Sequence, residues 1–190
     1  MPSKAEIAET VARKLTATLS PEEKKRIETK PTHSLPAYDC YLRAKELISR
    51  SAIEAVLGSD EPLRNAITLL EQAVRLDPEF TLAYCASAQI HGLLYFCYPS
   101  PERRAAGDAA IANALRLQPD LPEVRLAYAF QLYFCYDYPD YERIREQLTI
   151  AKRGLTNSAE VFRLEAWMDR RQGKWEKAIQ DLNEAIARSA

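Results

Sequence analysis

Apolar and polar positions along most of the chain follow the period of amphipathic helices, and small residues recur at matching places in successive segments. In the second half of each segment, a small residue is followed four positions later by a large apolar residue and three positions after that by alanine. The pattern occurs at Ala66-Leu70-Ala73, Gly107-Ile111-Ala114 and Ala178-Leu182-Ala185, with a larger first residue at Ile144-Leu148-Ala151. Small side chains let two helices approach closely, and large ones fill the gap between helix pairs. The pattern therefore predicts the second helices of four packed hairpins.

The first helix of each predicted hairpin carries its own small residue, at Ala44, Ala88, Ala129 and Ala166. The distance from this alanine to the first small or apolar position of the second-helix motif falls from 22 residues to 19, 15 and 12. Relative to the last hairpin, the first three thus contain 10, 7 and 3 extra residues. An insertion there lengthens a hairpin at its tip and leaves the packed motif intact, so we expect tips that grow toward the N-terminus.

These residues resemble the tetratricopeptide repeat, a helical hairpin of about 34 residues. The last unit matches best, with Ala166, Gly173, Trp175 and Ala178 at family positions. The resemblance implies an all-α, right-handed superhelix of about four antiparallel hairpins, with repeats at about 37–80, 81–121, 122–158 and 159–190. We therefore divide the chain into a helical leader and linker, residues 1–36, and a repeat domain, residues 37–190. About ten helices are expected in all, with no strand in the repeat domain.

The leader has an apolar stripe at Ile7, Val11, Leu15 and Leu19, which predicts an amphipathic helix. The segments 19–26 and 37–44 are similar to the junction in a bacterial family where a TolB-like domain precedes tetratricopeptide repeats. In that family, class III adenylate or guanylate cyclases, kinases or winged-helix regulators lie further upstream. The resemblance implies that this chain is the C-terminal interaction part of a signalling protein. Its apolar leader and its last helix are candidate surfaces for a homodimer.

Net charge, cysteine spacing and the lengths of apolar runs limit the classes of function that this chain can have. A net charge of −1 and a pI near 6.2 give no electrostatic reason to bind nucleic acid or an anionic membrane. The four cysteines lack C-x-x-C spacing, and three lie in apolar or aromatic runs, which predicts buried thiols in a reducing compartment. The sequence has no run of 18 apolar residues and no apolar core of a signal peptide. We expect a soluble, cytoplasmic protein.

Residues that carry catalysis or hold cofactors are not grouped in this sequence. His33 and His91 have no His or Cys partner at ligand spacing, and the five glycines are too isolated to form a phosphate-binding loop. The carboxylates are scattered over polar helix faces, without a pairing suited to acid–base chemistry. The sequence therefore predicts no enzyme activity, no metal site and no cofactor.

Partner contacts are expected on the first helices, because these line the concave face of stacked hairpins. Counting from the four first-helix alanines places twelve residues on that face: Tyr41, Lys45, Cys85, Gln89, Leu126, Phe130, Tyr133, Phe134, Arg163, Trp167, Arg170 and Arg171. This face runs from aromatic to basic. It predicts a protein or peptide partner with acidic and apolar residues, for which Trp167 beside arginines is a typical hot-spot composition.

Two alternatives remain open. Segments 94–98 and 132–136 repeat the sequence Leu-Tyr-Phe-Cys-Tyr, which fits either packing between lengthened helices or an aromatic recognition surface. The second of these would suit a small-ligand sensor that uses its aromatic groove. Trp167 likewise either contacts a partner or packs between hairpins.

Overall fold

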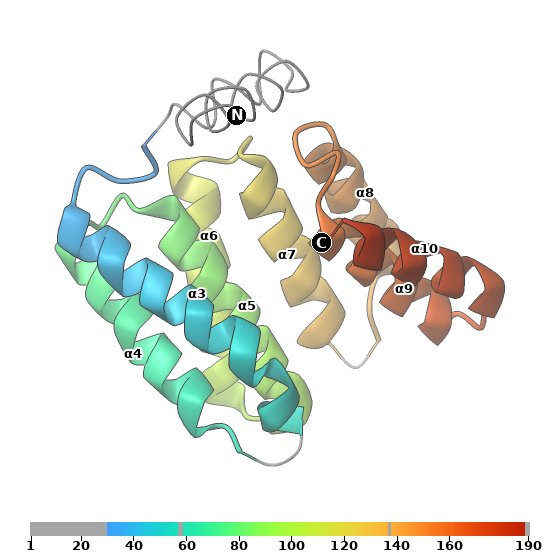
Figure 1. Cartoon of the computed structure of the whole chain (residues 1–190), viewed down its shortest axis with the longest axis horizontal. Coiled ribbons are helices and arrows are strands. Elements are labelled where there is room, and N and C mark those ends of the chain that lie inside the picture. The colour runs from blue at the N-terminus through green and yellow to red at the C-terminus, as the bar shows by residue number, and fades with distance from the viewer. Residues whose placement is uncertain (1–29, 57–58, 137, 189–190) are drawn as a thin grey trace, which may run out of the picture. The chain divides into compact units, whose positions relative to one another are not determined.

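The computed structural model describes residues 30–56, 59–136 and 138–188. These residues form eight helices and no strand, which confirms the predicted all-α class. The helices, labelled in Figure 1, are α3 (Leu35–Val56), α4 (Glu61–Leu76), α5 (Thr81–Cys97), α6 (Pro101–Leu117), α7 (Pro122–Phe134), α8 (Tyr141–Lys152), α9 (Ala159–Arg171) and α10 (Trp175–Ala187). The predicted leader helix, with Ile7, Val11, Leu15 and Leu19, lies outside the described residues, so the expected total of ten helices stays a prediction.

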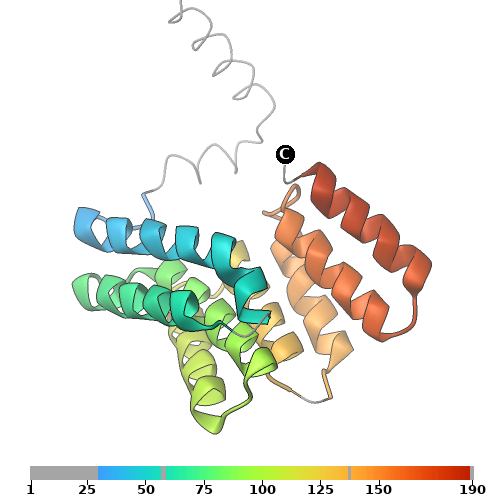
Figure 2. The same ribbon diagram turned by 60° about the horizontal axis from the view of Figure 1, so that its bottom comes forward.

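Consecutive helices pair as hairpins, and the hairpins pack in chain order. The chain divides into two units, residues 1–30 and 31–190, and only the second is considered below. Within it, α3 pairs with α4, α5 with α6, α7 with α8 and α9 with α10. The first helices α3, α5, α7 and α9 also contact one another in sequence, so they form a continuous row (Figures 1 and 2). This arrangement is a helical repeat; the handedness of its superhelix stays a prediction.

The small residues of the repeat motif lie where the helices pack most closely. All four first-helix alanines are buried, as are Ala66, Gly107, Ile144 and Ala178 on the second helices. Leu70, Ile111 and Leu148 of the motif are buried as well, each in a core shared with neighbouring helices. The sequence pattern thus located the core of the described hairpins.

Hairpin length decreases along the chain, as the motif spacing predicts. Helix α3 extends seven residues further beyond Ala44 than α9 extends beyond Ala166. Helix α4 begins five residues before Ala66, whereas α10 begins three residues before Ala178. In the second hairpin, α5 gains four residues and α6 gains three. In the third, however, the extra residues lengthen the connection, which spans 135–140 instead of the three residues 172–174 of the last hairpin. Pro139 and the N-cap Asp140, which accepts a hydrogen bond from Arg143 N at 3.1 Å, explain why α8 starts no earlier.

Helix ends follow the capping residues. Ser100 Oγ accepts a hydrogen bond from Arg103 N at 3.3 Å and caps α6, which begins at Pro101. The turn between α9 and α10 contains Gly173 at φ +74°, a backbone conformation that favours glycine. No helix in the described ranges is both long and apolar enough to cross a membrane.

Candidate functional site

We call the surface lined by the first helices α3, α5, α7 and α9 the groove. Its N-terminal half is formed by α3 and α5, and most of the predicted contact residues there contact other residues of the chain. The Tyr41 ring lies half-buried, 5.1 Å from the ring of Phe80 and 6.2 Å from that of Tyr38. Burial, followed by the nearby Cys85, raises the pKa of the Tyr41 hydroxyl. Lys45 Nζ lies 3.9 Å from Glu160 Oε1 on α9, so this ion pair spans the groove from the first hairpin to the last. Gln89 is half-buried on α5.

The C-terminal half, formed by α7 and α9, meets the end of α5 in an aromatic cluster. We define the cluster as Phe96 of α5, Phe130, Tyr133 and Phe134 of α7, and Trp167 of α9. The Trp167 ring lies 5.6 Å from Phe134 and 6.1 Å from Phe130, both edge to face. Phe134 also contacts Phe96 edge to face at 5.5 Å. Edge-to-face pairs are favourable beyond the area they bury. The structure thus brings four of the predicted contact residues together, whereas Tyr41, Lys45 and Gln89 lie outside the cluster.

Four of the predicted contact residues are not exposed. Phe130 and Tyr133 are both buried, and the expectation that they line an open groove is wrong. Tyr133 is held inside because its hydroxyl donates a hydrogen bond to the backbone oxygen of Trp167 at 3.1 Å, which satisfies the buried polar group. Burial raises the Tyr133 pKa, while Arg171 acts in the opposite direction. Leu126 and Cys85 are buried too, so the open surface consists of fewer residues than the sequence predicted.

Trp167 and Phe134 keep part of their surface accessible. Both are half-buried at the edge of the core formed by α7, α8 and α9. Trp167 therefore packs between hairpins, and because part of its surface stays accessible, its contact with a partner stays a prediction. The two copies of the aromatic segment differ in exposure: Phe134 is half-buried, whereas Phe96 in the earlier copy is exposed.

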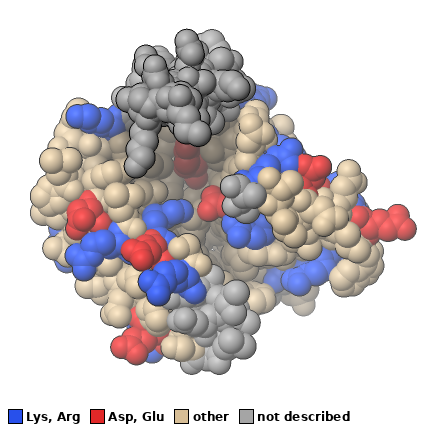
Figure 3. Space-filling view, in the orientation of Figure 1, with Lys and Arg blue, Asp and Glu red and all other residues tan. Residues whose placement is uncertain are grey.

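Three exposed arginines border the cluster on α9, and we call Arg163, Arg170 and Arg171 the arginine edge. Their spacing of seven and eight residues puts them on one helix face with Trp167. The guanidinium carbon of Arg171 lies 4.3 Å from the Tyr133 ring centre, and its Nη1 donates to the Tyr133 backbone oxygen at 3.3 Å. Arg163 approaches the Trp167 ring at 6.0 Å. In the space-filling view, basic side chains lie on both flanks of the central hollow of the repeat unit, and acidic side chains lie in and beside it (Figure 3).

The arginine edge has no carboxylate partner within the described part of the chain. The acidic residues of α9 are already paired with lysines: Asp169 lies 2.7 Å from Lys177 and 3.7 Å from Lys174, and Glu165 lies 2.6 Å from Lys152. The three guanidinium groups consequently retain hydrogen-bonding capacity beside an accessible aromatic surface. Arginine and tryptophan in this arrangement form the usual composition of a binding hot spot.

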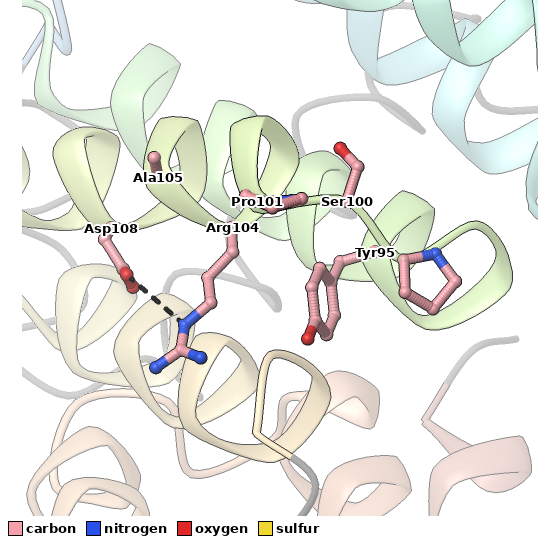
Figure 4. A pocket seen from close by; sticks show the side chains of 7 residues that line it. Tyr95, Ser100, Pro101, Arg104, Ala105 and Asp108 are labelled. Atoms are coloured by element: carbon pink, nitrogen blue, oxygen red, sulfur yellow. Dashed lines mark ion pairs between the residues drawn. The ribbon is translucent and has the colours of Figure 1, made fainter.

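A cavity of about 370 Å³ opens at the tips of the hairpins, next to the cluster. Its lining residues are Tyr95, Phe96, Pro99, Phe134, Tyr136, Pro139, Tyr141 and Arg171. A second cavity, of about 380 Å³, shares Tyr95 and Pro99 with it and contains the ion pair of Arg104 and Asp108 at 3.9 Å (Figure 4). Figure 4 shows the side chains of Tyr95 and Arg104 projecting on the same side of α5 and α6.

Sequence reasoning missed several residues of these cavities. Tyr141 and Arg104 lie on second helices, whereas all predicted contact residues lie on first helices. The guanidinium carbon of Arg104 lies 4.3 Å from the ring centre of Tyr136. The duplicated aromatic segments were the available signal, because they mark the tips of the second and third hairpins.

No cluster of three or more His, Cys, Asp or Glu side chains in the described ranges is placed to hold a metal ion. Comparison with known proteins found no matching family model, no matching curated protein and no matching solved structure. Fold and site define the chain as an all-α helical-repeat protein with an aromatic and basic surface at the C-terminal end of its groove.

Proposed function

We propose that this chain is a protein-interaction module, a tetratricopeptide-like repeat domain that binds a peptide segment with acidic and aromatic or aliphatic residues. The observation that carries the proposal is the arginine edge, three exposed guanidinium groups without an internal carboxylate partner beside Trp167. A carboxylate of the partner pairs with these groups in charge-assisted hydrogen bonds. An apolar side chain of the partner packs on the accessible face of Trp167, a rigid ring that loses little entropy on binding.

The nature of the partner follows from the charge distribution. With a net charge of −1 the chain lacks the basic surplus that drives binding to nucleic acid, and most of the lysines and arginines in the described ranges are paired with carboxylates. A local basic site on a neutral protein favours a locally acidic ligand. The family resemblance supports a cytoplasmic setting in a bacterial signalling protein, such as one with a nucleotide cyclase domain.

Tryptophan fluorescence tests the proposal. The chain has two tryptophans, so Trp175→Phe leaves Trp167 as the only one. We expect short peptides that alternate Asp or Glu with Phe or Leu to change its emission with dissociation constants in the micromolar range, about −8 kcal/mol. Peptides with Lys in place of the acidic residues should not bind.

Matched charge reversals give the control. Arg170→Glu should weaken binding of the acidic peptide at least tenfold, about 1.4 kcal/mol. Arg116→Glu, at another exposed arginine on α6, should leave binding unchanged. Equal losses from the two variants would show a non-specific charge effect and remove the support for this site.

A small-ligand sensor is the second candidate, and the hairpin-tip cavity favours it. Its volume of about 370 Å³ lies within the range of small-molecule sites, roughly 300–1,000 Å³. Aromatic walls and the Arg171 guanidinium suit a planar aromatic carboxylate. Such compounds should raise the melting temperature of the native chain, and Arg171→Ala should abolish the increase. A panel of aromatic carboxylates that leaves the melting temperature unchanged would count against this function.

A further inference from the structure

Helix α10 presents an apolar stripe that no described residue covers. Trp175, Ile179, Leu182 and Ile186 are 62%, 60%, 38% and 69% exposed. Spacings of four, three and four residues align their side chains on one face of the helix. Single exposed apolar residues are common, but four large ones in a row mark an interaction surface.

The repeat itself shows what this stripe is built to contact. Counted from the motif residues, Leu182 corresponds to Leu70, Ile111 and Leu148, which are only 0%, 4% and 2% exposed. In each earlier hairpin, the second helix packs against the first helix of the next one, α4 against α5, α6 against α7 and α8 against α9. At Leu182 the stripe therefore continues an interface that accepts a helix three times within this chain, whereas Ile179 corresponds to Asp108 and Arg145 in the second and third hairpins and makes α10 more apolar there.

The opposite end of the stack does not provide a matching surface. Counted from Ala44 and Ala88, Asp39 and Glu46 of α3 occupy the positions that Ala83 and Ile90 of α5 use in the core with α4. These carboxylates pair along α3 with Arg43 at 3.8 Å and Arg50 at 3.3 Å. Leu42, at the position of Ala86, is the apolar residue between them and is flanked by both carboxylates, which disfavours head-to-tail stacking of α10 of one copy on α3 of the next.

The stripe is instead complementary to itself. When two α10 helices lie antiparallel about a two-fold axis, Trp175 of each faces Ile186 of the other, and Ile179 faces Leu182. The spacing of the four residues is the same from either end of the stripe, so one arrangement satisfies both pairs. We propose that α10 is the interface of a two-fold symmetric homodimer, formed by antiparallel packing of α10 with α10 of a second copy.

The length of the helix sets the expected strength of this contact. Thirteen residues span about 20 Å, so a single helix pair buries an area at the low end of specific interfaces. The dimer is accordingly reversible, with a dissociation constant in the micromolar range. It is independent of the peptide site on α7 and α9.

Sedimentation velocity of the full chain over nanomolar to millimolar concentrations tests the proposal. We expect a concentration-dependent shift from monomer to dimer, and a monomer at all concentrations for Ile179→Asp. Leu42→Asp is the matched control, because Leu42 is a partly exposed apolar residue on α3. It should dimerise like the unmodified chain, and circular dichroism should show that both variants keep their helices.

A charge pair tests the orientation. Ile179→Lys and Leu182→Glu should each prevent dimerisation, and the double variant should regain it at low salt, because antiparallel packing puts the two new charges opposite each other. A chain that stays monomeric up to millimolar concentration would overturn the proposal, even if α10 then bound a helix of another protein. Dimerisation that survives Ile179→Asp would overturn it as well.

Discussion

The two halves of the groove contain similar residue types, yet they differ in whether their charged side chains are paired within the chain. In the N-terminal half, Tyr41 packs on Phe80 and Lys45 pairs with Glu160. In the C-terminal half, Trp167 keeps an accessible face and the arginine edge has no carboxylate partner among the described residues. An aromatic or basic residue on a concave face is therefore not by itself a contact residue. Because Tyr41 and Trp167 are both half-buried, the difference between the halves lies in the pairing of the neighbouring charged groups.

Alanine substitution at the two central rings tests this difference most strongly. Trp167→Ala and Tyr41→Ala should each lower the free energy of unfolding by about 3 kcal/mol, because each ring packs against a core. Only Trp167→Ala should also weaken binding of the acidic peptide to the folded protein, by about 2 kcal/mol. Urea unfolding and peptide titration on the same samples separate the two effects. If Tyr41→Ala weakened binding as much, the halves would not differ.

The boundary between the halves is sensitive to a single methyl group. Gln131 of α7 is buried and donates to Asp108 Oδ1 at 2.9 Å, and a Cβ added at Gly107 would lie 2.6 Å from its side-chain amide. Gly107→Ala should therefore destabilise the chain by about 1–2 kcal/mol, despite alanine's better helix propensity.

Gly92→Ala on α5 is the matched control, because its new Cβ would meet its neighbours no closer than 3.5 Å. It should be neutral or stabilising in thermal unfolding. Equal destabilisation by the two substitutions would mean that the contact with Gln131 is not the cause.

The ion pair across the groove should contribute little to stability. Lys45 and Glu160 are 3.9 Å apart with side chains about 40% exposed, so solvent screens their attraction. Lys45→Ala should lower the free energy of unfolding by no more than about 0.5 kcal/mol, and high salt should remove the difference. Arg170→Ala breaks no ion pair within the described ranges, so high salt should not change its effect on stability. A loss of several kcal/mol for Lys45→Ala would show that the pair holds the groove closed.

The smallest expected effect is a pH dependence in the N-terminal half. Burial, followed by the positive charge of Arg103, lowers the pKa of His91 below 6.5. The folded state therefore favours neutral His91, and the unfolded state binds more protons at mildly acidic pH. The free energy of unfolding should be constant above the ordinary histidine pKa and decrease as the pH falls below it. His91→Asn should reduce that slope, and an identical slope in the variant would contradict the assignment.

The regular part of the fold was predictable because small residues mark the close approach of helices. Ala44, Ala88, Ala129 and Ala166 located the hairpins, and the spacing to the second-helix motif predicted the longer first hairpins. The place of the extra residues in the third hairpin was less predictable, because motif spacing counts inserted residues without saying whether they extend a helix or a loop. Pro139 favours the loop here.

The site was predictable only in outline. Counting along α7 placed Phe130 and Tyr133 on the correct side of the helix, but their burial depends on how closely α9 approaches, which no local pattern specifies. Similarly, the sequence showed the arginines of α9 but not that Lys152, Lys174 and Lys177 would take up the neighbouring carboxylates. Availability for a partner is a property of the packed structure.

Reversal of the charge preference is the sharpest test of the arginine edge as the peptide-binding site. Acidic and basic versions of the same aromatic peptide are titrated against the unmodified chain and Arg170→Glu, with circular dichroism to confirm equal folding. We expect the unmodified chain to prefer the acidic peptide and Arg170→Glu to lose this preference or invert it. A variant that keeps the full preference for the acidic peptide would contradict the arginine edge as the binding site.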